Sequence, residues 1–145
     1  MGFRVNPVDM GLFLRALGLA RRTQKVRSAP VSDVVASIAR RGGGGGRQPT
    51  QRVELATTRA VARWRRWFSG IDTCLMRSLV LGGMLAGRGN VELNIGFRPG
   101  EEESVLDGHA WVTVDGCPVG SDGILAQERY TRVLAVPFFS GPGGE

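Results

Sequence analysis

Two side chains of this sequence could carry out nucleophilic chemistry together, namely Cys74 and the only histidine, His109. Cys74 opens an almost unbroken apolar segment that runs to Gly87, and its length and composition predict a buried helix. The first backbone N–H groups of a helix have no partner within it and create a partial positive charge, which stabilises a thiolate. Because an imidazole can accept the thiol proton, the pair is typical of thiol catalysis. The alternative for a lone histidine is a purely structural role.

Such a site needs a third group that orients the imidazole. His109 begins a predicted strand that closes on Asp115-Gly116, and this dipeptide is a strong signal for a two-residue hairpin turn. The return strand is expected to begin at Cys117, with Asp122 near its far end. An acid across this hairpin could be that third group.

The elements that position these residues follow from the spacing of apolar side chains. Strict alternation of apolar and polar residues, as in the segment 91–97, predicts a half-buried strand. Helices beside a small antiparallel sheet make this an α+β protein. The expected elements are one helix within residues 1–22, helices over 31–41, 52–68 and 74–87, strands over 91–97, 109–114, 117–120 and 132–136, and a short helical turn over 127–130.

A run of five glycines at positions 42–46 marks the clearest internal boundary, because such a run holds no fixed conformation unaided. We expect a basic helical N-terminal extension over residues 1–48 that ends in this joint, followed by a catalytic domain over residues 49–137. Residues 138–145 are rich in glycine and proline, which is typical of a flexible tail.

Charge is divided unevenly along the chain, whose formal net charge is +6. Residues 1–66 carry 14 basic and 3 acidic side chains, whereas residues 67–145 carry 5 basic and 10 acidic ones. The basic half could dock on an acidic partner or peptide, or its arginines could form solvated helix faces. Arginine and tryptophan interleave in the segment 52–68, but a tryptophan stripe at helical spacing is more typical of core contacts than of nucleic-acid or membrane binding.

Some classes of protein and site do not fit the sequence. No apolar run is long enough to span a membrane, and the first residues lack the pattern of a secretory signal. We therefore expect a cytoplasmic protein with reduced thiols. One histidine and two distant cysteines, Cys74 and Cys117, match no zinc spacing, so we expect no metal and no cofactor. Cys117 is interpreted as a small apolar residue beside the turn.

Four short motifs follow one another in the second half of the chain. They are Cys74-Leu75-x-Arg77-Ser78, Ile95-Gly96-x-Arg98, His109-Ala110-Trp111-Val112 and Asp115-Gly116-x-Pro118-Val119. In this order and at this spacing they resemble the transglutaminase-like cysteine peptidases of lasso-peptide biosynthesis. These are the stand-alone leader peptidases related to the C-terminal domain of the microcin-processing protein. The resemblance covers roughly residues 50–137.

The resemblance implies a papain/transglutaminase-like fold, in which a central helix carries the nucleophile and packs on a small antiparallel sheet. It implies that Cys74 is the nucleophile, and that His109 acts first as general base and then as general acid. The family places its acid about twelve residues after the histidine, where this chain has Ser121. We choose Asp122, one residue further on, as the third catalytic residue, and reject Asp115 because it sits in the turn dipeptide. Neighbouring residues of a strand face opposite ways, so Asp122 needs a bulge near Gly120 to turn its side chain toward His109. Without such a bulge, Ser121 or a backbone carbonyl would orient the imidazole.

The implied reaction is hydrolysis of a ribosomally made precursor peptide at the junction of leader and core, through an acyl-enzyme. The implied partners are that precursor, a small leader-recognition protein and an ATP-dependent lasso cyclase that forms the macrolactam. The N-terminal region and Arg59, Arg63 and Arg66 are the expected docking surface for the recognition protein or the leader. Two alternatives stay open: an acyltransferase that uses the same cysteine and histidine, and a catalytically silent module that binds a peptide.

Overall fold

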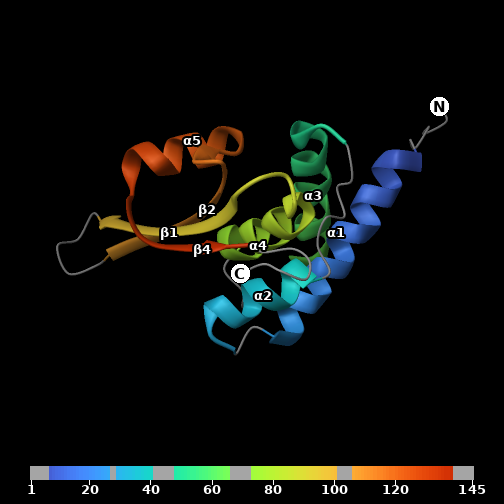
Figure 1. The fold of residues 1–145 in the computed structure, drawn as a ribbon, viewed down its shortest axis with the longest axis horizontal. Coiled ribbons are helices and arrows are strands. Elements are labelled where there is room, and N and C mark those ends of the chain that lie inside the picture. Colours follow the sequence, from blue (N-terminus) through green and yellow to red (C-terminus); the bar gives the residue numbers. More distant parts are fainter. Residues whose placement is uncertain (1–6, 27–28, 41–47, 66–72, 101–105, 139–145) are drawn as a thin grey trace.

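The structure is a computed structural model of the chain, in which residues 7–26, 29–40, 48–65, 73–100 and 106–138 are described. Helices precede the strands along the sequence, and one further helix is inserted before the last strand (Figure 1). The elements are α1 (Pro7–Val26), α2 (Val31–Arg40), α3 (Thr50–Arg65), α4 (Thr73–Leu85), β1 (Val91–Pro99), β2 (Leu106–Val114), β3 (Cys117–Pro118), α5 (Gly120–Arg129) and β4 (Thr131–Pro137).

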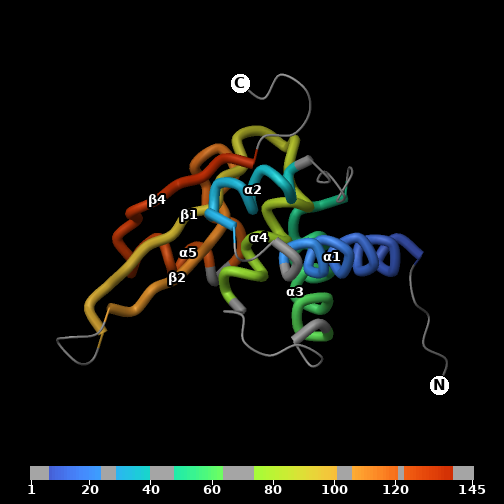
Figure 2. The backbone as a smooth tube through the Cα atoms, turned by 90° about the horizontal axis from the view of Figure 1, so that it is seen from below, coloured from blue at the N-terminus to red at the C-terminus, as the bar shows by residue number. Residues whose placement is uncertain are grey.

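Helix α4 is the centre of the hydrophobic core. It contacts α1, α2 and α3, and it also packs on β1 and β2. Its apolar side chains are buried almost all the way round, which matches the continuous apolar segment in the sequence. Figure 2 shows α1 and α3 beside each other at one end of the molecule and the sheet at the other. The fully buried members of the core with the largest side chains include Val35, Ile38, Val53, Val80, Met84, Leu85, Val91, Leu93 and Val112.

Helices α1 and α2 contribute buried residues, such as Ala16 and Ile38, to the same core as α3 and α4. The sequence predicted a boundary between residues 1–48 and 49–137, at a glycine joint. Residues 41–47 lie outside the described part of the chain, so this division stays a prediction. The predicted tail, residues 138–145, is described only at Phe138, whose ring is buried in the core.

The four strands form one antiparallel sheet in the order β3-β2-β1-β4. The register of β1 and β2 pairs Val91 with Val114 at one end and Arg98 with Asp107 toward the other. The hairpin between β2 and β3 turns at Asp115 and Gly116, whose φ angles are 51° and 84°. A two-residue turn with positive φ at both positions is of type I′, and the two-residue hairpin turn that the Asp-Gly dipeptide predicted is confirmed.

The two faces of the sheet carry different side chains. Ala110 and Val112 of β2 belong to the main core, which lies on the face that α4 covers. Alternation along the strand places Trp111 and Thr113 on the opposite face. There the Thr113 hydroxyl accepts a hydrogen bond of 3.0 Å from the amide of Asn94, and both residues are buried. Helix α5 contacts β2 and β3, and Figure 1 shows α5 and α2 on different sides of the sheet.

Most of the predicted elements are confirmed, including the α+β class with a cysteine-bearing central helix on a small antiparallel sheet. The predicted return strand over 117–120 is wrong, because β3 ends at Pro118. The predicted short turn over 127–130 is also wrong in extent, because the ten-residue helix α5 occupies Gly120–Arg129. Among the described helices, none combines the length and the apolar character needed to cross a membrane.

Candidate active site

Cys74 lies in the first turn of α4, one residue after the helix begins at Thr73. Its side chain is half-buried, is not in a disulfide, and packs against the edge of the core. The sequence predicted a cysteine at the beginning of a buried helix, and this position is confirmed. The thiol is thus close to the first backbone N–H groups of the helix, which have no hydrogen-bond partner within it. A thiolate is stabilised at this position.

His109 lies in the middle of β2 and is half-buried. Its imidazole stacks on the ring of Tyr130, with 5.2 Å between the ring centroids and 24° between the ring planes. Tyr130 is the residue between the end of α5 and the beginning of β4. The stacking partner of the only histidine is therefore supplied by a segment more than twenty residues away in the sequence.

Tyr130 is itself held by two charged residues of the neighbouring strands. Its hydroxyl donates a hydrogen bond of 2.9 Å to Oδ2 of Asp107 on β2. The guanidinium of Arg98 on β1 lies 4.9 Å from the centre of the tyrosine ring, within the range of a cation–π contact. Arg98 Nε also donates a bond of 2.9 Å to the same Asp107 oxygen, so the three side chains form a closed network. We call Arg98, Asp107, His109 and Tyr130 the tyrosine cluster.

The tyrosine cluster shifts the protonation of two of its members. Burial raises the pKa of Tyr130 above its usual 10.0, and the hydrogen bond to Asp107 raises it further. The hydrogen bonds from Tyr130 and Arg98 lower the pKa of Asp107 below its usual 3.8, and the charge of His109 lowers it further. The carboxylate form of Asp107 and the neutral form of Tyr130 are both favoured near neutral pH. The Asp107 side chain is 42% exposed, so solvent screens these charge interactions and their energies are small.

Cys74 is connected to the tyrosine cluster through its charge. The Cys74 thiolate adds to the rise in the pKa of Tyr130, and Tyr130 stacks on His109. Cys74 and His109 come from different elements: Cys74 lies on α4, which packs on the face of β2 that carries Ala110, whereas alternation puts His109 on the other face. The direct contact between the two side chains that thiol catalysis needs therefore stays a prediction.

Gly96 on β1 pairs with His109 on β2, and the absence of a side chain at Gly96 allows neighbouring groups to pack closely there. A Cβ atom at this position would lie 2.9 Å from the ring of Trp111 and 2.8 Å from the backbone oxygen of Thr131. Trp111 is buried, as expected for core packing, and its indole N–H has no hydrogen-bond partner within the described part of the chain. An unsatisfied buried donor costs about 1–3 kcal/mol, so close packing of this ring has to offset that cost.

Asp122, the predicted third catalytic residue, lies in a different element from the one expected. Because α5 begins at Gly120, both Ser121 and Asp122 belong to its first turn rather than to the far end of a strand. The alternation rule that distinguished the two positions applies to strands and has no force in a helix. The side chains of residues 121 and 122 lie outside the described part of the structure, so the choice between them stays a prediction.

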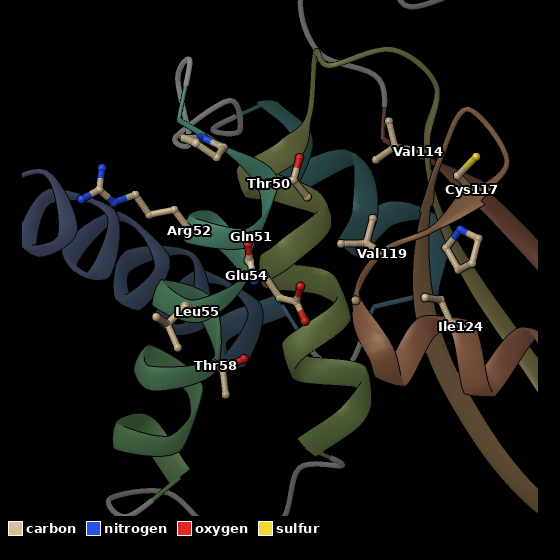
Figure 3. A pocket seen from close by; sticks show the side chains of 13 residues that line it. Thr50, Gln51, Arg52, Glu54, Leu55, Thr58, Val114, Cys117, Val119 and Ile124 are labelled. Carbon is tan, nitrogen blue, oxygen red and sulfur yellow. The ribbon is translucent and has the colours of Figure 1, made fainter.

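A cavity of about 1070 Å³, shown in Figure 3, has neither Cys74 nor His109 among its lining residues. It is an open groove between α3 and the segment from the end of β2 to α5, and exposed Cys117 stands on its wall. Glu54 points from α3 toward the beginning of α5. The other residues that line the groove are Pro49, Thr50, Gln51, Arg52, Leu55, Thr58, Val114, Pro118, Val119, Gly120 and Ile124.

Comparison with known proteins identifies the fold. The family model of the transglutaminase-like superfamily matches residues 8–135. The chain belongs to the transglutaminase-like superfamily. Neither the search of curated proteins nor the search of solved structures gave a match. Membership of this superfamily indicates cysteine peptidase or acyltransferase chemistry, and the cysteine-bearing helix α4 on its antiparallel sheet agrees with a transglutaminase-like domain.

Sequence reasoning did not find three members of the tyrosine cluster. Arg98 stood in one of the motifs that carried the family resemblance, but its partner was unknown. The register of the β1–β2 pair, which sets Arg98 opposite Asp107, is the signal that could have found this contact. No sequence signal connects Tyr130 with His109, because the path of α5 over the sheet brings them together.

Proposed function

We propose that this transglutaminase-like protein is a cysteine peptidase that removes the leader from a ribosomally synthesised precursor peptide during lasso-peptide maturation. The observation that carries the proposal is the position of Cys74 in the first turn of the central helix α4 of a transglutaminase-like domain. The order of the four sequence motifs supports the narrower assignment to leader removal. The chemistry then follows from the two side chains.

In the proposed reaction His109 takes the proton of the Cys74 thiol, and the thiolate attacks the carbonyl carbon at the junction of leader and core. The developing oxyanion is stabilised by the backbone N–H of Cys74 at the helix end. The C–N bond breaks as the imidazolium gives its proton to the leaving amine. Water, activated by the same imidazole, attacks the thioester and releases the carboxylate and the free thiol. Asp122, or Ser121 in its place, is the proposed third member that orients His109.

Cleavage of a candidate precursor by the wild type, by Cys74→Ala and by His109→Ala tests the proposal. We expect a free carboxylate at the new C-terminus by mass spectrometry, and loss of this product in both variants. Cleavage that persists in Cys74→Ala would refute a cysteine peptidase. Each reaction is run with and without the leader-recognition protein, because the resemblance implies that the two act together.

An acyltransferase is the second candidate, because the superfamily includes both chemistries and they share the same acyl-enzyme. A new amide on the precursor, in place of a free carboxylate, would establish this alternative. A catalytically silent peptide-binding module is the third candidate. Retention of the precursor by all three proteins, with no product, would favour it.

We further propose that the basic face of α3 binds the leader or the recognition protein, in the cytoplasm, before the lasso cyclase acts. Arg59 and Arg63 are exposed on α3, and Arg66 lies outside the described residues. Charge reversal of these arginines should raise the amount of recognition protein needed for half-maximal cleavage. Leader-dependent cleavage that is unchanged would refute this docking surface.

A further inference from the structure

An imidazole that serves as a base must keep its ring in one orientation, because only one nitrogen can face the thiol. The second side-chain torsion of histidine is intrinsically broad, so contacts have to fix it. His109 has such a contact in Tyr130, whose ring stacks on it nearly in parallel. A ring that lies flat against the imidazole limits its rotation from that side.

Tyr130 can serve this purpose only if its own position is fixed, and the structure provides two anchors. Its hydroxyl donates to Asp107, and the Arg98 guanidinium lies against its ring. Arg98 and Asp107 face each other in the β1–β2 register and are bonded to each other. The anchor is thus built on two paired strands, whereas Tyr130 follows the end of α5 at the edge of the sheet.

We propose that Tyr130, anchored by Asp107 and Arg98, is the positioning residue that holds the His109 imidazole in its working orientation. Asp107 acts on His109 through Tyr130 and does not take the place of the acid expected on α5. This role rests on the proposed pairing of Cys74 with His109. The neutral phenol, which is the ordinary form of tyrosine near neutral pH, is the form that donates to Asp107.

The chain offers a direct readout of this role, because it contains one histidine. The imidazole protons of His109 are therefore assigned in an NMR spectrum without ambiguity, and a stacked tyrosine shifts them by its ring current. We expect Tyr130→Leu to move these resonances toward random-coil positions. Tyr130→Phe keeps the stacked ring but loses the bond to Asp107, so its resonances should move less.

A second readout is the alkylation of Cys74, measured in a Cys117→Ser background that leaves a single thiol. At about pH 6.5 an ordinary thiol is only about 1% ionised, so fast labelling by iodoacetamide there reports a stabilised thiolate. We expect His109→Ala to slow this labelling by about 10–100-fold. Tyr130→Leu should slow it by about tenfold, and Tyr130→Phe and Asp107→Asn by a smaller factor. Phe13→Leu removes a ring from α1, a helix that contributes no residue to the cluster, and serves as the matched control.

The outcomes separate this role from the proposed function. If His109→Ala leaves Cys74 labelling unchanged, the catalytic pair is refuted, and the NMR shifts alone then decide whether Tyr130 orients the imidazole. If His109→Ala slows labelling but Tyr130→Leu changes neither the rate nor the resonances, Tyr130 has no positioning role and the pair stands. If circular dichroism shows that Tyr130→Leu does not fold, Tyr130→Phe and Asp107→Asn are used in its place. Labelling rates and His109 resonances equal to those of the wild type in both variants would refute the positioning role.

Discussion

The replacement of Gly120 by alanine should lower the free energy of unfolding through two separate effects. Gly120 begins α5, the helix that carries Asp122 and leads to Tyr130, and its φ is 75°. A side chain in this left-handed region costs about 1–2 kcal/mol. The added Cβ would also meet the Glu54 carboxylate, whose Cδ atom would be 2.7 Å away.

The contact with Glu54 has its own energy because that carboxylate lies at the N-terminus of α5. The N-cap residue Val119 makes no side-chain hydrogen bond to the helix, and the Glu54 carboxylate on α3 adds a negative charge close to this end. A carboxylate at a helix N-terminus contributes about 0.3–1 kcal/mol. The glutamate can swing away from the new methyl group, so this contribution is lost rather than replaced by a severe clash. The expected total for Gly120→Ala is a loss of about 2 kcal/mol in the free energy of unfolding.

Urea unfolding at neutral pH measures this loss, and Gly116→Ala is the matched control. Gly116 has a φ of 84°, and an added Cβ would meet no atom within 4 Å, so this variant carries the backbone cost alone. Glu54→Gln should cost about 0.3–1 kcal/mol in the wild type and close to nothing in Gly120→Ala, because the contact is already lost. Equal losses for the two alanine variants, together with a Glu54→Gln cost that is the same in both backgrounds, would refute this reasoning.

Three further predictions concern protonation and helix stability. The chain has one tyrosine, so absorbance at 295 nm should show Tyr130 ionising above pH 10.0, and Asp107→Asn should bring its pKa down because burial alone then raises it. Because the pKa of Asp107 is lowered in the fold, its contribution to stability is present above pH 3.8 and is lost as the pH falls further. Acid unfolding followed by circular dichroism should therefore show a smaller loss of stability with falling pH in Asp107→Asn than in the wild type. Gly11→Ala and Gly18→Ala should each raise the free energy of unfolding by about 0.5–1 kcal/mol, because an added methyl meets no atom within 4 Å in α1, and unchanged urea midpoints would contradict this.

The elements with strong periodicity could be predicted from the sequence. The apolar segment after Cys74 became α4, the alternation from Val91 became β1, and Asp115-Gly116 became the type I′ turn. In each case the local pattern and the tertiary packing favour the same structure, so the pattern suffices.

Helix α5 could not be predicted in the same way. Gly120 and Gly123 lower its intrinsic helix propensity, and its apolar residues Ile124 and Leu125 stay exposed. One charge that favours its N-terminus comes from Glu54, which is distant in the sequence. A helix stabilised by tertiary contacts leaves little trace in the local sequence.

Some residues of the candidate site could be predicted from the sequence and others could not, for the same reason. Cys74 and His109 could be found from residue type and position, because thiol chemistry needs both. Tyr130 could not, because its stacking on His109 depends on where α5 ends. The expected position of Asp122 was wrong for the same reason, since it assumed a return strand where the chain forms a helix.

The central claim is that the Cys74 sulfur and the His109 imidazole act as a pair, and chemical bridging tests it most directly. A reagent with two reactive carbons separated by one carbonyl, such as 1,3-dibromoacetone, is added to folded Cys117→Ser protein, and the digest is mapped by mass spectrometry. The account predicts one intramolecular bridge that joins the peptide containing Cys74 to the peptide containing His109. Alkylation of Cys74 at a single point, with His109 unmodified and no bridge formed, would contradict it.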